Sequence, residues 1–230
     1  IQIQNSRIIY LDYLLSNFYF NLFFTIFCFL VLINGSNFID GLNGLSIGYF
    51  FLIFLSILLL KTKYGGELIG INIFYYLAII SGIFLIFNFF NKCYLGDNGI
   101  YFVSAFAGYF LIEFSNQNLK QISPIYVVSI LWYPAFENLF SIIRRTYGNS
   151  KITGPDNLHL HTLVFKILKE KYSFLIANNL SSMIILLCCL PGFVLSNLFH
   201  YQSFILGVII FINIFLYLNI YYYLNKLTNK

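Results

Sequence analysis

Three short polar motifs interrupt a chain that is otherwise almost continuously apolar. Hydrophobic residues make up 60% of its 230 residues and charged residues 9%, against roughly a quarter charged in an ordinary soluble domain. A water-soluble globule of this size cannot bury so much leucine, isoleucine and phenylalanine. Because a helix satisfies its own backbone hydrogen bonds in lipid, the composition predicts an all-α, polytopic membrane helix bundle. The motifs are Asn34–Leu45 (NGSNFIDGLNGL), Leu95–Gly99 (LGDNG) and Asp156–His161 (DNLHLH).

Seven apolar segments approach the roughly 20 residues that cross a bilayer, so we treat residues 1–230 as a single transmembrane domain. The one long polar stretch, Ser141–Ser173, is too long for a simple turn. We expect it to be a cytoplasmic loop that carries function or a short amphipathic helix. The predicted spans are Asn17–Ile33, Leu45–Leu60, Leu68–Phe90, Ile100–Phe114, Ile122–Phe140, Phe174–Leu195 and Phe204–Tyr223.

Counting these spans places all three motifs on one side of the membrane. The first motif joins spans one and two, the second joins spans three and four, and the third joins spans five and six. Of the 13 lysine and arginine residues, nine lie on the motif side and four on the other. Since basic residues favour the cytoplasmic side, we predict cytoplasmic motif loops. The net charge of +5 therefore reflects basic residues that fix the orientation in the membrane, and no nucleic-acid partner is expected.

The first motif combines amide and carboxylate side chains with glycines. Glycine permits tight turns that aim backbone N–H groups at a ligand. Asn37 and Asn43 offer hydrogen-bond donors and acceptors that suit a nucleobase or a sugar. The alternative is a glycine-rich turn between two helices. So many polar side chains between two apolar spans exceed what a turn requires, which favours a site that includes Asp40.

The second motif places Asp97 at the mouth of two spans. A carboxylate there suits Mg²⁺, which prefers carboxylate and phosphate oxygens, and Tyr94 suits stacking on a planar base. Taken alone, Asp97 fits a helix N-cap and Tyr94 fits an aromatic residue of the membrane interface. Both alternatives stay open at this point.

The segment after the fifth span is the richest in ionisable side chains. Arg144 and Arg145 can bind phosphate oxygens bidentately, although they also fit topological charges that contact lipid headgroups. Asp156, His159 and His161 follow. A transition-metal site is disfavoured because no thiolate or further histidine completes a ligand shell. Two imidazoles that bind a diphosphate beside arginine and lysine residues fit better.

In this order, the motifs resemble a known enzyme family. The segments NGSNFIDGLNGL, YLGDNGIYF, SPIYVVSILWYPAFENLFSIIRR and GPDNLHLHTLVFKIL lie between Ile8 and Leu168. They resemble the polyprenyl-phosphate N-acetylhexosamine-1-phosphate transferases of glycosyltransferase family 4. The similarity is greatest to bacterial members that begin surface-polysaccharide assembly, such as that of lipopolysaccharide. The resemblance implies a phosphoglycosyltransferase of the bacterial inner (plasma) membrane. Such an enzyme transfers N-acetylhexosamine 1-phosphate, most simply GlcNAc 1-phosphate, from a UDP-sugar to undecaprenyl phosphate and releases UMP.

The resemblance also implies roles at the nucleotide and at the metal ion. Asp97 matches the Mg²⁺-binding aspartate of the family, with Mn²⁺ as an alternative ion. Asn37 and Asp40 match positions of the nucleotide site. Asn43 stands where the peptidoglycan branch carries an aspartate near uracil, and Tyr94 takes the place of a base-stacking aromatic residue.

Other positions match the part of the family site that meets the phosphates. His159 and His161 match a His-x-His element, and Arg144 and Arg145 match a basic pair near the phosphates. The spans are expected to supply a lipid-facing groove for the prenyl chain. The implied catalytic set is Asp40, Asp97, His159 and His161.

The implied partners are a UDP-N-acetylhexosamine, a polyprenyl phosphate and membrane lipids, with a homodimer as an open alternative. The family's Asp-Asp pair and its early lysine-bearing loop have no counterpart in this chain and would lie upstream of Ile1. We therefore expect the chain to be the C-terminal part of a larger transferase. Two alternatives remain, namely a catalytically incomplete fragment that only binds lipid or nucleotide, and a small membrane transporter. A transporter would place ionisable groups within its spans or show inverted repeats, whereas these polar clusters lie at span ends.

Overall fold

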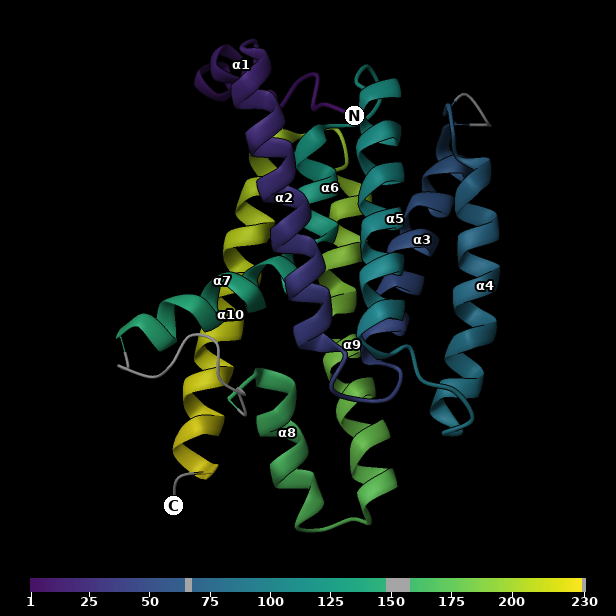
Figure 1. Ribbon diagram of the computed structural model, residues 1–230, viewed down its shortest axis with the longest axis vertical. Coiled ribbons are helices and arrows are strands. Elements are labelled where there is room, and N and C mark those ends of the chain that lie inside the picture. Colours follow the sequence, from purple (N-terminus) through teal and green to yellow (C-terminus); the bar gives the residue numbers. More distant parts are fainter. Residues whose placement is uncertain (65–67, 148–157, 229–230) are drawn as a thin grey trace.

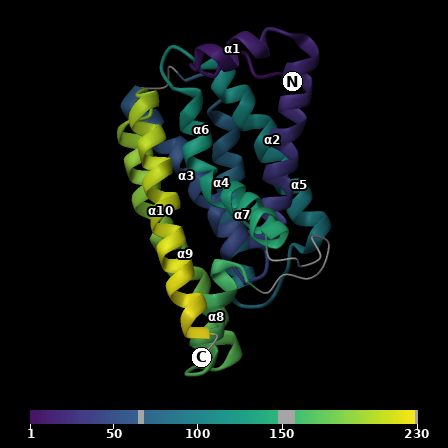
Figure 2. The ribbon, with the colours of Figure 1, turned by 90° about the vertical axis from the view of Figure 1, so that its left-hand side faces the viewer.

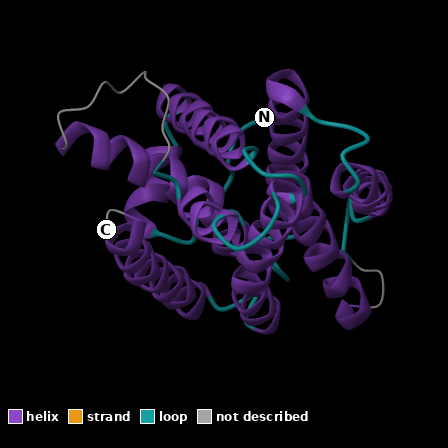
Figure 3. Cartoon of the chain, turned by 90° about the horizontal axis from the view of Figure 1, so that it is seen from below, coloured by secondary structure: helices purple, strands orange, loops and turns teal. Residues whose placement is uncertain are grey.

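The computed structural model describes residues 1–64, 68–147 and 158–228, and throughout these ranges the regular structure is helical (Figures 1 and 3). Each predicted span is covered largely by helix, with a break in the fifth, and this confirms the all-α polytopic bundle. Short helices lie between the long ones, and they are α1 (Ile9–Leu15), α6 (Pro124–Ile130) and α8 (Leu160–Lys169). The long helices are α2 (Phe18–Ile39), α3 (Leu45–Tyr64), α4 (Asn72–Phe89), α5 (Gly96–Gln117), α7 (Trp132–Tyr147), α9 (Phe174–Leu198) and α10 (Ser203–Thr228).

Among the described residues, four helices are individually long and apolar enough to cross a membrane, and they are α2, α4, α9 and α10. The helices α6 and α7 pass the same test as a bent pair, which gives up to five spans. The helix α3 holds a shorter apolar stretch, Leu45–Leu60, and forms the centre of the bundle between α4 and α9. Side chains along α3 are fully buried, namely those of Leu45, Tyr49, Phe50, Ile53 and Ile57.

The fifth predicted span, Ile122–Phe140, is wrong as a continuous helix. The helix α7 turns by 67° from α6 and runs across the bundle in Figure 1. The cause is Pro134, because proline has no N–H for the carbonyl four residues earlier and its ring would clash with that carbonyl. This carbonyl belongs to Ile130, and it accepts a hydrogen bond from Tyr49 Oη instead, at 2.9 Å. The side chain on α3 therefore satisfies the backbone group that the break leaves without a helical partner.

The helices α2 and α7 approach each other closely at Gly35. A Cβ atom added to Gly35 would lie 2.0 Å from the carbonyl oxygen of Pro134. The first motif is helical up to Ile39, so the turn expected from its glycines is confined to residues 40–44. Gly35 thus allows two backbones to pack, and the expectation that it belongs to a ligand-binding turn is wrong.

The three motif regions that the structure describes lie at the same end of the bundle. The helices alternate in direction, so the turn 40–44, the connection 90–95 and the segment 158–169 all come to the lower end of Figure 1. Figure 2 shows α8 beside the lower parts of α9 and α10, with which it packs. The described parts of the three motifs therefore lie at one end of the bundle. We call these three segments the motif end.

Candidate functional site

Asp40 ends α2 at the motif end. The chain turns sharply after it, and Gly44 adopts a φ of +78°, a conformation that residues with a side chain rarely adopt. A Cβ atom at Gly44 would also lie 2.6 Å from the ring of Phe89. Ser46 Oγ donates a hydrogen bond to the Asp40 carboxylate. The turn therefore holds Asp40 half-buried and in a fixed direction.

Asp97 lies in the first turn of α5, where its side chain is exposed. Burial raises the pKa of the Asp40 carboxyl from an ordinary value of 3.8 to about 6, the hydrogen bond from Ser46 lowers it by less, and the charge of Asp97 raises it further. The two carboxylates therefore interact electrostatically, although they belong to different motifs.

Two carboxylates at one end of the bundle are the kind of donors that a hard divalent cation binds. Within the described ranges, no group of three or more His, Cys, Asp or Glu side chains could hold a metal ion. Mg²⁺ does not need such a cage, since one or two carboxylates hold it together with water and substrate phosphates. A divalent cation also relieves the repulsion between Asp40 and Asp97.

Asparagine side chains from neighbouring elements hold the turn 40–44 in place. Asn88 accepts a hydrogen bond from the backbone of this turn, and Asn178 Oδ1 accepts one from Asn43 N–H at 2.8 Å. Asn43 Nδ2 donates to Asn91 Oδ1, and Tyr94 Oη donates to the same oxygen at 3.3 Å. The motif pattern assigns Asn43 and Tyr94 to the nucleotide but misses these partners. Buried asparagines within apolar helices were the available signal, because such residues usually bond between helices.

The histidine motif packs on the first motif. His159 is the N-cap of α8, His161 lies in the first turn, and both are buried. Their rings stack with centroids 5.5 Å apart, and the Phe38 ring lies 5.1 Å from that of His159. A Cβ atom at Gly41 would lie 3.1 Å from His161 Nε2. Gly41 therefore leaves room for an imidazole beside the turn that carries Asp40.

A buried carboxylate holds His159 from the other side. Glu137 on α7 is 1% exposed, and its Oε1 lies 2.8 Å from His159 Nδ1 and accepts from Leu160 N–H at 3.3 Å. Its Oε2 accepts a hydrogen bond from Tyr217 Oη at 2.7 Å. The sequence alone places Glu137 at the end of a span and gives it no role. The cost of a carboxylate in an apolar segment is the signal that points to it.

Only one of the remaining predicted site residues that the structure describes lies next to this cluster. Asn37 is half-buried in the last turn of α2. Arg144 and Arg145 lie in the last turn of α7, which in Figure 1 extends away from the turn 40–44. Arg144 Nη1 donates to Tyr221 Oη on α10 at 3.2 Å. Asp156 lies outside the described residues.

We expect metal binding at this site to weaken in mild acid. Below a pH of about 6 the Asp40 carboxyl is protonated and uncharged, and above it the group is ionised, so affinity for Mg²⁺ should fall as the pH drops through this value. A bound cation favours the ionised form, so higher Mg²⁺ concentrations should move the midpoint to lower pH. Titration calorimetry across a pH series measures both effects. Asp40→Asn should abolish the transition, and a midpoint at about 4, the value for an unperturbed carboxyl, would contradict the expectation.

Comparison with known proteins gives one family match. A family model described as glycosyl transferase family 4 matches residues 1–115, half of the 230-residue chain. The matched half contains Asp40 and Asp97, whereas Glu137 and the histidine motif follow it. Comparisons with curated proteins and with solved structures find no match.

Proposed function

The chain belongs to glycosyl transferase family 4, and from this premise we propose that it transfers GlcNAc 1-phosphate from UDP-GlcNAc to undecaprenyl phosphate. Members of the family are phosphoglycosyltransferases, so the general reaction is the transfer of a sugar 1-phosphate to a polyprenyl phosphate within a membrane. The observation that carries the proposal is the meeting of Asp40, Asp97 and the histidine motif at one end of the bundle. We assign this end to the cytoplasmic face of a bacterial inner membrane, where nucleotide sugars are made.

In the proposed reaction, an oxygen of the lipid phosphate bonds to the phosphorus next to the sugar. The bond from that phosphorus to the bridging oxygen breaks, and UMP leaves with this oxygen. Such a reaction depends on positioning and on neutralisation of phosphate charge. Asp97 and Asp40 would hold Mg²⁺, which neutralises diphosphate charge when bound. His159 and His161 would bind the diphosphate from the α8 side.

The nucleotide would lie against the asparagine-rich side of the motif end. Tyr94 is 65% exposed and its hydroxyl donates a hydrogen bond to Asn91, an arrangement that suits stacking of the ring on uracil. Asn37 and Asn43 flank Asp40 and would contact the uridine or the sugar. Since Asn43 Nδ2 already donates to Asn91, Asn43 would use its amide oxygen.

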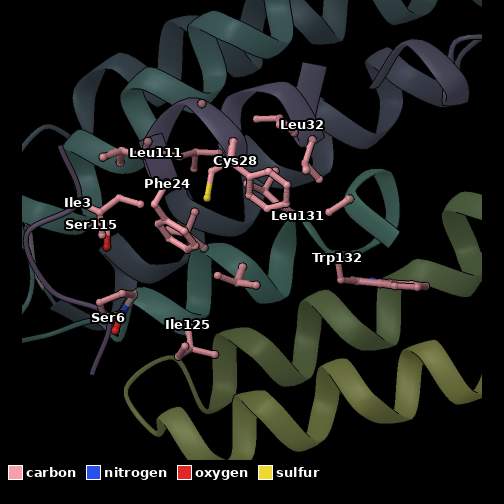
Figure 4. A pocket seen from close by; sticks show the side chains of 18 of the residues that line it. Ile3, Ser6, Phe24, Cys28, Leu32, Leu111, Ser115, Ile125, Leu131 and Trp132 are labelled. Atoms are coloured by element: carbon pink, nitrogen blue, oxygen red, sulfur yellow. The ribbon is translucent and has the colours of Figure 1, made fainter. Parts of the chain in front are cut away.

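An apolar cavity of about 470 Å³ supports a lipid acceptor. It is lined by the N-terminal segment and by α1, α2, α5, α6, α7 and α10, and Figure 4 shows Phe24, Leu111 and Leu131 at its wall. Phe136 on α7 lines the cavity, and the next residue, Glu137, holds His159. The helix α7 thus lies between the cavity and the histidine motif. A prenyl chain in the cavity would bring its phosphate around α7, whose last turn offers Arg144 and Arg145.

The proposal predicts that membranes containing the protein release UMP from UDP-GlcNAc only when undecaprenyl phosphate and Mg²⁺ are both present. Chromatography of the released nucleotide measures the reaction, and the lipid product is followed from labelled GlcNAc. UDP-GalNAc in place of UDP-GlcNAc tests the sugar. Binding of UDP-GlcNAc without UMP release would contradict turnover and favour the alternative of a binding-only chain.

A further inference from the structure

Three hydrogen-bonding groups converge on the buried side chain of Glu137. They are His159 Nδ1, Leu160 N–H and Tyr217 Oη, at 2.8, 3.3 and 2.7 Å from its two oxygens. Glu137, His159 and Tyr217 are 1%, 5% and 2% exposed. Burial of a carboxylate costs free energy unless its lone pairs accept hydrogen bonds. The groups around Glu137 supply such bonds, and the resulting cluster joins α7, α8 and α10.

The contact with His159 fixes the state of the imidazole ring. An ionised carboxylate can only accept hydrogen bonds, so the nitrogen that faces it, Nδ1, carries a hydrogen. In the neutral ring the lone pair is then on Nε2, and Nε2 is the nitrogen that takes up or gives a proton.

Resting on the proposed function, we propose that Glu137 is a positioning residue of the transfer reaction. It holds His159 in the Nδ1–H tautomer beside His161, which packs on the turn of Asp40, so that His159 meets the diphosphate through Nε2. The parallel stacking of His159 on His161, with ring planes at 9°, and the contact with Phe38 keep the ring from rotating. The family match ends before Glu137, so this role rests on the geometry alone.

Nitrogen NMR of the protein in micelles tests the tautomer without any assay of activity. Label on histidine reports the rings of His159, His161 and His200, and single His→Asn variants assign their signals. We expect His159 to carry its hydrogen on Nδ1 in the wild type and in Tyr217→Phe, which leaves Oε1 of Glu137 in place. In Glu137→Leu we expect the Nδ1–H signal of His159 to be lost.

His200 is an internal control for folding in the same spectra. Its Nδ1 lies 2.7 Å from the carbonyl oxygen of Asn197 at the other end of the bundle, so its signal should be the same in all variants. If Glu137→Leu does not fold, the spectra of the wild type and of Tyr217→Phe still show which ring nitrogen of His159 carries the hydrogen. A wild-type His159 protonated on Nε2 alone would overturn the proposal.

Kinetics separate positioning from a merely structural role. Glu137→Gln keeps the size of the side chain but removes its charge. We expect kcat to fall at least about 10-fold, because removal of one preorganised electrostatic group costs about 10² or more, with KM for UDP-GlcNAc changed by about twofold or less. Glu137→Asp, which keeps the charge, should retain a higher kcat than Glu137→Gln. An unchanged kcat in Glu137→Gln would overturn the proposal, whereas a wild type that releases no UMP contradicts the proposed function and leaves the tautomer to be decided by NMR.

Discussion

Replacing Asp97 with asparagine should lower the rate of UMP release by about 100-fold or more, the size of effect seen when one electrostatic group is removed from a preorganised site. The amide keeps the shape of the side chain but removes the charge that would hold Mg²⁺. Because Asp97 is exposed in the first turn of α5, the yield of folded protein should stay the same. Initial rates in membranes, normalised to the amount of enzyme, measure the loss.

Two further variants show whether the loss belongs to the site. Glu113→Gln removes a carboxylate from the opposite end of α5, where it accepts a hydrogen bond from Gln117 at 2.6 Å, and it should keep the wild-type rate. Asp40→Asn should lose activity as Asp97→Asn does, but without loss of stability, since it removes a charge whose burial is unfavourable. Full activity in both aspartate variants would contradict the assignment of the metal site.

The architecture of the bundle follows from features that are local in the chain. Span length and composition predict the helices, and counting spans predicts that Asp40, Asp97 and the histidines share one end. The break between α6 and α7 cannot be predicted from the sequence, because transmembrane helices tolerate proline when neighbours satisfy the freed backbone group. That group is the carbonyl of Ile130, and its partner, Tyr49, lies on another helix.

The site was predictable where its chemistry lies within a single motif. Asp40, Asp97 and His159 stand out as polar side chains at span ends. Their partners do not, because these partners are brought together only by packing of helices that are distant in sequence. The contacts of Glu137 with His159 and Tyr217 join residues 22 and 80 positions apart.

The glycines of the first motif also show that a contact between distant helices cannot be predicted from a local pattern. Gly44 is required by its backbone conformation, as a turn signal suggests, whereas Gly35 is required by the backbone of α7. No local pattern distinguishes these two reasons. Substitution with alanine distinguishes them, because only at Gly35 would the added methyl group push two helices apart.

Gly35→Ala should destabilise the protein by about 1–3 kcal/mol or more, the range for overpacking a well-packed interior. The added Cβ would lie 2.0 Å from the Pro134 carbonyl oxygen, and a backbone atom cannot move aside as the end of a side chain can. Trp132, the one tryptophan of the chain, lies at the start of α7 and is 7% exposed. Its fluorescence therefore reports both the thermal unfolding midpoint and any shift of this junction.

Gly207→Ala is the matched control, because the same methyl group on α10 would meet nothing within 4 Å. It should leave the fluorescence unchanged and, since alanine favours a helix over glycine by up to about 1 kcal/mol, should not lower the midpoint. In Gly35→Ala, the lower midpoint should come with a lower rate of UMP release, because α7 carries Glu137 and through it His159. Equal midpoints in the two variants would mean that α2 and α7 are not in backbone contact, and the position of α7 over the motif end would have to be revised.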